Sequence, residues 1–261
     1  MTVGSRPQVS WVVIAVHELR VLWLSARGLT VLFGYTLLLS IMAFVAASEA
    51  QLNLLDARES VGIVVQMAIG LGTLAALVVS ADAISGERER DTLEALLVTP
   101  VSRRALVIGK MAGASSMWMA GITVALPYVI AMARGPGVAA DAMFVLVVAG
   151  SLVGVSLTAV GMAISAVAMS NRVSLAAAVG LLLVFAAPSQ LPAVTANGVL
   201  GSFLIAANPV SAGLKLAGLV LIDQESLASH WTLLISPAVA AIVLSFVAIR
   251  LSSRVRLGGA R

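Results

Sequence analysis

The sequence contains no cysteine, so it can form no disulfide and carries no thiol chemistry. Charged residues are also scarce, at 11% of 261 residues, whereas hydrophobic residues make up 60% and the mean hydropathy is +1.06. A soluble globular protein uses about twice this share of charged side chains. The low charge therefore excludes that class and places the chain in a lipid bilayer.

Residue patterns for catalysis are missing as well. The chain has two histidines and shows no spacing of His, Cys or carboxylates typical of a metal site. It has no Ser/His/Asp grouping or paired carboxylates in its apolar stretches, which argues against an intramembrane enzyme. Gly109-Lys110 is followed by Met111 and lacks the upstream glycine of a phosphate-binding loop. We therefore expect no catalytic, cofactor or metal residues here, and any ATP hydrolysis requires another chain.

Long uncharged stretches dominate what is present. A helix needs about 20 apolar residues to cross a bilayer, and six stretches without a charged residue qualify: 29–47, 61–81, 111–133, 143–169, 173–191 and 231–249. Continuous runs are not the alternating pattern of a β-barrel. The sequence predicts an all-α polytopic membrane protein, a single transmembrane domain over 1–261 with six transmembrane helices. We expect the first stretch to be a retained span and not a signal peptide.

The distribution of basic residues predicts the orientation. With a cytoplasmic N-terminus, only Arg58, Arg134 and Lys215 lie outside. The other basic residues fall inside: Arg6, Arg20, Arg27, Arg88, Arg90, Arg103, Arg104, Lys110, Arg172, Arg250, Arg254, Arg256 and Arg261. This positive-inside bias predicts that both termini are cytoplasmic. The pI near 10.3 then indicates topology and contact with anionic lipid, and not nucleic-acid binding.

The residues before the first span predict an amphipathic helix over 9–26. Its polar positions gather within one arc, which suits a helix lying in the membrane interface. The residues expected at the interface are Trp11, His17, Glu18, Arg20 and Trp23. A cytoplasmic extension of the first span is the alternative.

Small residues recur at four-residue intervals in several spans, as in Gly109 and Gly113 or Gly150 and Gly154. Such spacing predicts close packing of helix backbones in a membrane. Between the fifth and sixth stretches the chain is apolar but interrupted by prolines and glycines, with a turn expected at Asn208-Pro209. Two short helices at the outer face would account for it.

A cluster of charged residues lies between the second and third uncharged stretches, at residues 85–99. Leu93, Leu96 and Leu97 have the i, i+3, i+4 spacing of one helical face, which predicts an amphipathic helix of about four turns. A solvated connecting loop is the alternative. Such a loop does not need an apolar leucine face, whereas a helix that docks onto a partner does need one. The predicted docking residues are Glu87, Arg88, Glu89, Arg90, Asp91, Leu93, Glu94, Leu96 and Leu97.

The segment Ser-Gly-Glu-Arg-Glu-Arg-Asp-Thr-Leu-Glu-Ala-Leu-Leu-Val-Thr-Pro, with Gly109-Lys110 downstream, resembles the same region of type-2 ABC transporter permeases. Asn208-Pro209 is similar to a feature of the nitrous-oxide-reductase-maturation-like and multidrug-export-like branch. The resemblance implies six spans, an elbow helix at 9–26, a coupling helix at 85–99 and an external helical hairpin. It also implies two cytoplasmic ATPase subunits that bind ATP and Mg²⁺, and a second permease copy or paralogue.

We therefore expect the transmembrane subunit of an ATP-driven exporter in the cytoplasmic membrane, in contact with lipid and moving a hydrophobic or amphiphilic substrate. Two other hypotheses stay open. One is a non-transporting assembly or mechanotransmission protein that docks the same ATPase. The other is a secondary carrier or channel, which the absence of ionisable residues from the six stretches disfavours.

Overall fold

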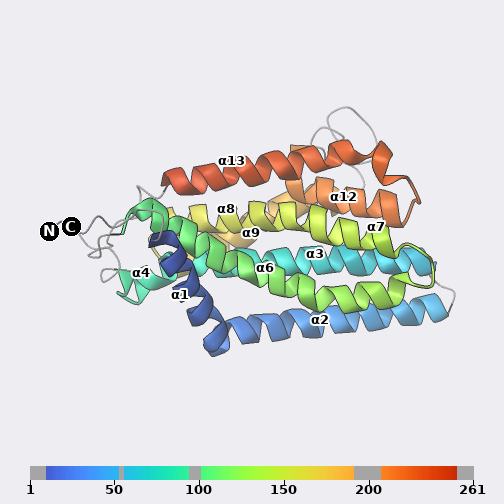
Figure 1. The fold of residues 1–261 in the computed structure, drawn as a ribbon, viewed down its shortest axis with the longest axis horizontal. Coiled ribbons are helices and arrows are strands. Elements are labelled where there is room, and N and C mark those ends of the chain that lie inside the picture. Colours follow the sequence, from blue (N-terminus) through green and yellow to red (C-terminus); the bar gives the residue numbers. More distant parts are fainter. Residues whose placement is uncertain (1–9, 53–55, 94–100, 191–206, 252–261) are drawn as a thin grey trace.

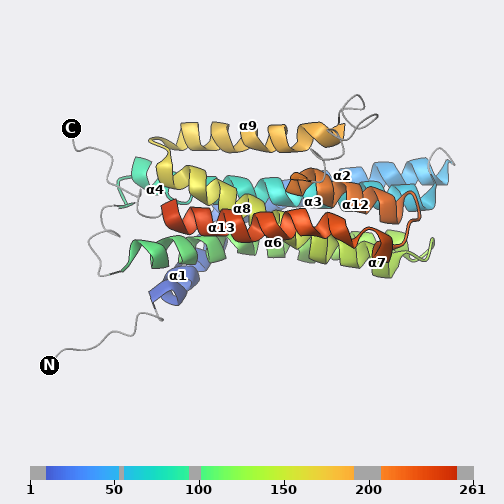
Figure 2. The same ribbon diagram turned by 90° about the horizontal axis from the view of Figure 1, so that it is seen from above.

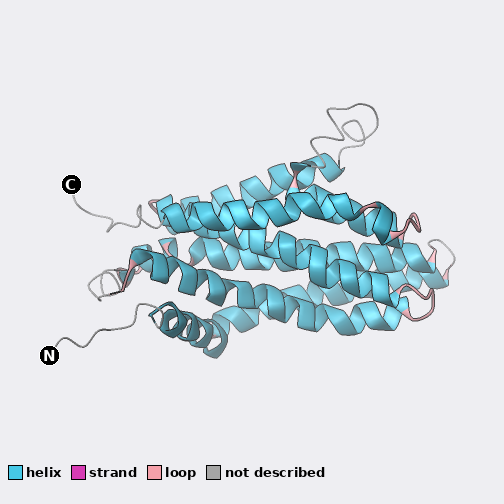
Figure 3. Ribbon diagram, turned by 45° about the horizontal axis from the view of Figure 1, so that its top comes forward, coloured by secondary structure: helices cyan, strands magenta, loops and turns pink. Residues whose placement is uncertain are grey.

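The protein is described by a computed structural model, which covers residues 10–52, 56–93, 101–190 and 207–251. Every regular element in these ranges is a helix, and none of them is a strand (Figure 3). The all-α prediction is therefore confirmed. Helices are the expected solution because, within a bilayer, each backbone amide and carbonyl must be satisfied inside its own segment.

The six predicted spans are confirmed as six helices that are long and apolar enough to cross a membrane. They are α2 (Ala26–Gln51), α3 (Ala57–Asp82), α6 (Arg103–Ala133), α7 (Ala139–Phe144) continued by the π-helical η1 (Val145–Ala149) and α8 (Gly150–Val167), α9 (Asn171–Gln190), and η3 (Trp231–Leu234) continued by α13 (Ile235–Leu251). The fourth span is thus one long helix that widens locally at η1.

α3 lies at the centre of the bundle and packs against α2, α6, α8 and α9. α2, α9 and α13 lie on the outside, and Figure 2 shows α9 standing apart on one side. Their outward residues are large and apolar, such as Phe44, which is 74% exposed, and Leu183, which is 65% exposed. Such a surface is unfavourable in contact with water, in agreement with the membrane class predicted from composition.

Different segments of the chain lie at the two ends of the bundle. α1 (Ser10–Leu24), α4 (Ser85–Glu89), the start of α6 and the end of α13 lie together at the left of Figure 1. α7, α12 (Pro209–Leu221) and the end of α2 lie at the opposite end. An even number of spans returns the chain to its starting side, so α4 shares an end with α1.

Trp118 of α6 fills a slot made by three glycines. A Cβ atom on Gly72, Gly150 or Gly154 would lie 2.7, 2.8 or 2.9 Å from the Trp118 ring. The indole nitrogen donates a hydrogen bond to Ser151 Oγ at 3.1 Å, and the residue is 2% exposed. The small-residue pattern therefore does mark close packing, but these glycines make room for a side chain and not for a second backbone.

The N-terminal helix α1 runs obliquely to α2 and crosses α6 (Figure 1). Glycines on α6 allow the crossing: a Cβ atom on Gly109 would lie 2.7 Å from Ile14, and one on Gly113 would lie 2.6 Å from Glu18. A helix is therefore present where the elbow was predicted. Its position in the membrane interface stays a prediction.

Asn208 begins α12 as its N-cap. Asn208 Oδ1 accepts hydrogen bonds from the amides of Val210 and Ser211 at 3.0 and 3.2 Å, and Pro209 occupies the first helical position, where no amide is needed. The predicted Asn208-Pro209 turn is thus a helix start. The rest of the predicted hairpin falls on 191–206, outside the described residues.

The helix predicted over 85–99 is not continuous. α4 ends at Glu89, and Asp91 adopts a left-handed backbone with φ of 57°, a conformation that aspartate tolerates better than most residues. The prediction of one four-turn helix is therefore wrong in its first half. The physical reason is packing, because the turn at Arg90–Asp91 directs Leu93 toward Ile84 and Val107, with which it is buried. Glu94, Leu96 and Leu97 lie outside the described residues.

Candidate functional site

The charged segment is fastened to the membrane helices by a buried lysine. Lys110 on α6 is 1% exposed, and its Nζ lies 2.6 Å from Glu18 Oε1 on α1 and 2.6 Å from Glu87 Oε1 on α4. An ammonium group removed from water is stable only when it is paired and hydrogen-bonded. Lys110 therefore joins three helices through one charge.

Glu87 is the less satisfied of the two carboxylates. Its Oε2 atom is buried and has no hydrogen-bond partner among the described residues. Burial raises the pKa of Glu87, while Lys110 opposes the rise and Glu18 adds to it. Glu87 therefore takes up a proton more readily than an ordinary glutamate.

A second buried charge lies at the end of α3. Asp82 is 3% exposed and pairs with Arg27 of α2, while Arg90 approaches at 3.7 Å. A Cβ atom on Gly86 would lie 2.4 Å from Asp82 Oδ1, so any larger residue at this position would displace the Asp82 carboxylate. Asp82 therefore links α3, α2 and the turn after α4.

These charges surround one cavity of about 80 Å³. Its charged lining consists of Glu18, Arg27, Asp82, Glu87, Arg90 and Lys110. Three acidic and three basic groups balance each other, and the volume is enough for one or more water molecules of about 30 Å³ each. We refer to these six residues as the ion-pair network. The network is built to hold helices together, because each of its charges is used by a neighbour.

The remaining charges of α4 cap two other helices. Arg88 donates hydrogen bonds to the carbonyls of Ala166, at 3.3 Å, and Ala168 at the end of α8. Glu89 Oε2 accepts one from the amide of Asn171 at 3.0 Å, at the start of α9. A cation at a helix C-terminus and an anion at an N-terminus are the favourable arrangement. α4 therefore fixes the junction between the fourth and fifth spans.

Serine hydroxyls hold the other end of α4. Ser165 Oγ on α8 accepts hydrogen bonds from the amides of Ile84 and Ser85 at 3.0 and 2.9 Å. Ser85 Oγ in turn donates to Ala81 O at 2.8 Å and to Asn171 Oδ1 at 3.1 Å. The first turn of α4 is thus bound to α3, α8 and α9 without charge.

The predicted docking residues separate into three groups. Glu87 and Arg88 bond to helices of the same chain, and Leu93 is 1% exposed within an apolar cluster, so it does not present its side chain to a partner. Glu89, Arg90 and Asp91 are exposed. The other three predicted residues are Glu94, Leu96 and Leu97, which lie outside the described part of the chain.

The predicted elbow residues also separate. Trp11, His17 and Arg20 are exposed. Glu18 turns inward to Lys110, and the indole nitrogen of Trp23 donates to Ser116 Oγ on α6 at 3.0 Å. One side of α1 therefore belongs to the bundle, while the other is free to meet lipid or a partner.

Sequence reasoning did not assign Arg27, Asp82 and Lys110 to a site. A signal was present, because Asp82 and Lys110 lie directly at the ends of uncharged stretches, where a charge is costly unless it is paired. Their partners were not readable, since Glu18 and Lys110 are 92 residues apart. In the described ranges no group of three metal-ligating side chains occurs.

Comparison with known proteins bears directly on this architecture. A sequence profile described as "ABC-2 family transporter protein" matches residues 13–255, nearly the whole chain. The chain belongs to the ABC-2 transporter family. Members of the ABC-2 family are membrane transport subunits that work with ABC ATPase partners, and this ABC-2 protein is accordingly a multi-pass membrane protein. A search of curated proteins finds no match.

Proposed function

We propose that this ABC-2 protein is the transmembrane subunit of an ATP-driven exporter and that its charged segment receives the motion of the ATPase. The observation that carries the proposal is the position of α4, which bonds to α6, α8 and α9 through Glu87, Arg88 and Glu89. Lys110 extends this connection to Glu18 on α1. A displacement of α4 is therefore transmitted to helices on both sides of the bundle. The sequence has no phosphate-binding loop, so ATP and Mg²⁺ belong to the partner subunits.

The docking surface is narrower than the sequence predicted. Glu89, Arg90 and Asp91 face solvent, while Glu87, Arg88 and Leu93 connect that surface to the spans. Leu96 and Leu97 remain the predicted apolar contacts. In this arrangement Glu89, Arg90 and Asp91 meet the ATPase, and the bonds that Glu87, Arg88 and Glu89 make with neighbouring helices carry the force inward.

The positive-inside bias supports an orientation with α4, and with it both chain termini, on the cytoplasmic side of the cytoplasmic membrane. The exposed apolar surfaces of α2 and α9 support a pair of permease subunits related by two-fold symmetry, each with one ATPase. The charges of the ion-pair network lie at one end of the bundle, and the spans are otherwise apolar. This distribution favours a hydrophobic or amphiphilic substrate.

Docking is tested by co-purification with the cognate ABC ATPase. We expect Leu96→Asp combined with Leu97→Asp to abolish ATPase retention while the permease still inserts. Asp91→Lys should weaken retention, and the matched control Asp141→Lys, an exposed aspartate on α7 at the opposite end, should not. Full retention by the leucine double variant would refute docking through this segment.

Transport is tested separately in proteoliposomes that contain the permease and its ATPase. ATP-dependent flux of an amphiphilic dye, lost in the double variant, is the expected result. ATPase binding without any flux would favour an assembly or mechanotransmission role. Flux driven by an ion gradient without ATP would favour a secondary carrier.

A further inference from the structure

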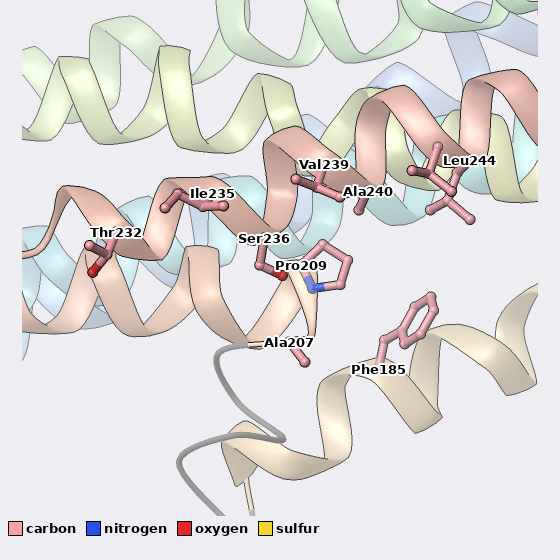
Figure 4. Close-up of a pocket in the computed structure, with 10 residues that line it drawn as sticks. Phe185, Ala207, Pro209, Thr232, Ile235, Ser236, Val239, Ala240 and Leu244 are labelled. Atoms are coloured by element: carbon pink, nitrogen blue, oxygen red, sulfur yellow. The ribbon is translucent and has the colours of Figure 1, made fainter.

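A pocket of about 600 Å³ lies between α9, α12 and α13 and shares no lining residue with the ion-pair network (Figure 4). Its walls are largely apolar and include Phe185, Pro209, Val239, Ala240 and Leu244. The volume falls in the range of about 300–1,000 Å³ that is typical of ligand pockets. The size and lining indicate a site for a hydrocarbon group.

The pocket exists because two outer spans are held apart. α9 and α13 each pack against α8 and α12 but make little contact with each other. The carbonyl of Phe185 accepts hydrogen bonds from Asn208 Nδ2 at 2.7 Å and Ser211 Oγ at 3.0 Å, which fixes α9 to the start of α12. The walls are therefore set by hydrogen bonds, so the space is a built feature of the fold.

The pocket opens toward the membrane. Ile235, Val239 and Val243 on its α13 side are 47%, 52% and 50% exposed, and they lie on a membrane-spanning helix. The surrounding medium at this depth is hydrocarbon. A chain from that medium reaches the pocket without crossing water.

The pocket is polar at one end only. Thr232 and Ser236 line this end, and Ser236 Oγ is buried without a hydrogen-bond partner in the described ranges. Trp231, 59% exposed, stands beside Thr232, and exposed tryptophan is typical of headgroup depth. Leu244 lies at the opposite, apolar end (Figure 4). An occupant therefore places a polar group near Thr232 and an apolar tail toward Leu244.

We propose that this pocket holds one acyl chain of a bilayer phospholipid from the leaflet at the α12 end of the bundle. A phospholipid is favoured over a helix of a second subunit because the polar side chains lie toward the exposed Trp231 and the rest of the lining is apolar, as a headgroup above an acyl chain requires. The bound chain fills the gap between α9 and α13, so it is a structural ligand of a single permease. The site does not depend on ATPase docking or on the proposed export.

The experiment uses the full-length protein in nanodiscs made with phosphatidylglycerol that carries a photoreactive diazirine on one acyl chain. Two probes are compared, with the diazirine near the ester or near the chain end, and adducts are mapped by peptide mass spectrometry. The ester-proximal probe should label the region of Thr232 and Ser236, and the distal probe the region of Phe185 and Leu244. This depth order needs no variant.

Two variants on α13 test occupancy. Ala240→Phe fills the pocket and should lower pocket adducts by about tenfold, a loss equivalent to one decade in the dissociation constant. Ile242→Phe, at a 72% exposed position outside the pocket, should leave them unchanged. Uniform labelling of all outer helices, with no depth order and no effect of Ala240→Phe, would mean annular lipid only. That result, or adducts confined to other helices because a second subunit covers the pocket, would overturn the proposal.

Discussion

Lys110 Nζ lies 2.6 Å from Glu18 Oε1, so the N-terminal helix is joined to the third span by a buried ion pair. The same ammonium group contacts Glu87 of the charged segment at the same distance. The elbow and the proposed docking segment are therefore not independent attachments. A force on one reaches the other through a single side chain.

Replacing Lys110 by methionine should destabilise the protein by about 3 kcal/mol, because two carboxylates then lose their buried counter-charge. We expect a lower midpoint of thermal unfolding in detergent at about pH 8, where carboxylates are ionised. The control Lys215→Met removes an exposed lysine and should have little effect. Adding Glu18→Gln and Glu87→Gln to Lys110→Met should restore part of the loss. Equal stability of the Lys110 and Lys215 variants would contradict the role of the ion pairs.

The raised pKa of Glu87 predicts a pH dependence of stability. An acid whose pKa is higher in the folded state binds more protons when folded, so its favourable contribution is present at low pH. That contribution is lost as the pH rises from the ordinary value of 4.5 through the raised pKa. The stability difference between the wild type and Glu87→Gln should therefore decline across this window in thermal melts. A flat difference would argue against burial as the dominant effect.

Gly86→Ala should disrupt the second charge cluster. The added Cβ would lie 2.4 Å from Asp82 Oδ1 and would displace the carboxylate from Arg27 and Arg90. We expect a clear fall in the unfolding midpoint together with weaker ATP-stimulated flux. Gly70→Ala on α3 is the matched control, since no atom lies within 4 Å of its Cβ position. Replacing a helical glycine by alanine in open space should stabilise by up to about 1 kcal/mol.

Trp118→Ala should cost about 3–5 kcal/mol, because it leaves a cavity between α3, α6 and α8. Trp231→Ala, at a site that is 59% exposed, should cost far less. Denaturant or thermal unfolding of the two variants side by side measures the difference. Similar losses at both positions would mean that the glycine slot around Trp118 is not a tightly packed part of the fold.

Sequence reasoning predicted the six spans correctly because each is an uncharged run of sufficient length, and this property is local. It failed for 85–93, the described part of the helix predicted over 85–99, where the i, i+3, i+4 leucine spacing predicted one exposed face. Leu93 instead packs with Ile84 and Val107, and a left-handed Asp91 breaks the helix to allow this. The i, i+3, i+4 spacing of leucines indicates that these side chains pack in an apolar environment. It does not indicate whether that environment is formed by the same chain or by a partner.

The sequence by itself determined that this chain lies in a membrane, how many times it crosses and which segment carries its charge. These properties follow from the energetic cost of charge and unsatisfied backbone in hydrocarbon, which is a sum over neighbouring residues. Only the tertiary structure decided that Lys110 forms ion pairs with both Glu18 and Glu87. It also decided that three glycines surround Trp118 and that a pocket remains between α9 and α13. Each of these relationships joins residues that are far apart in the chain, and only the packing of the helices brings them into contact.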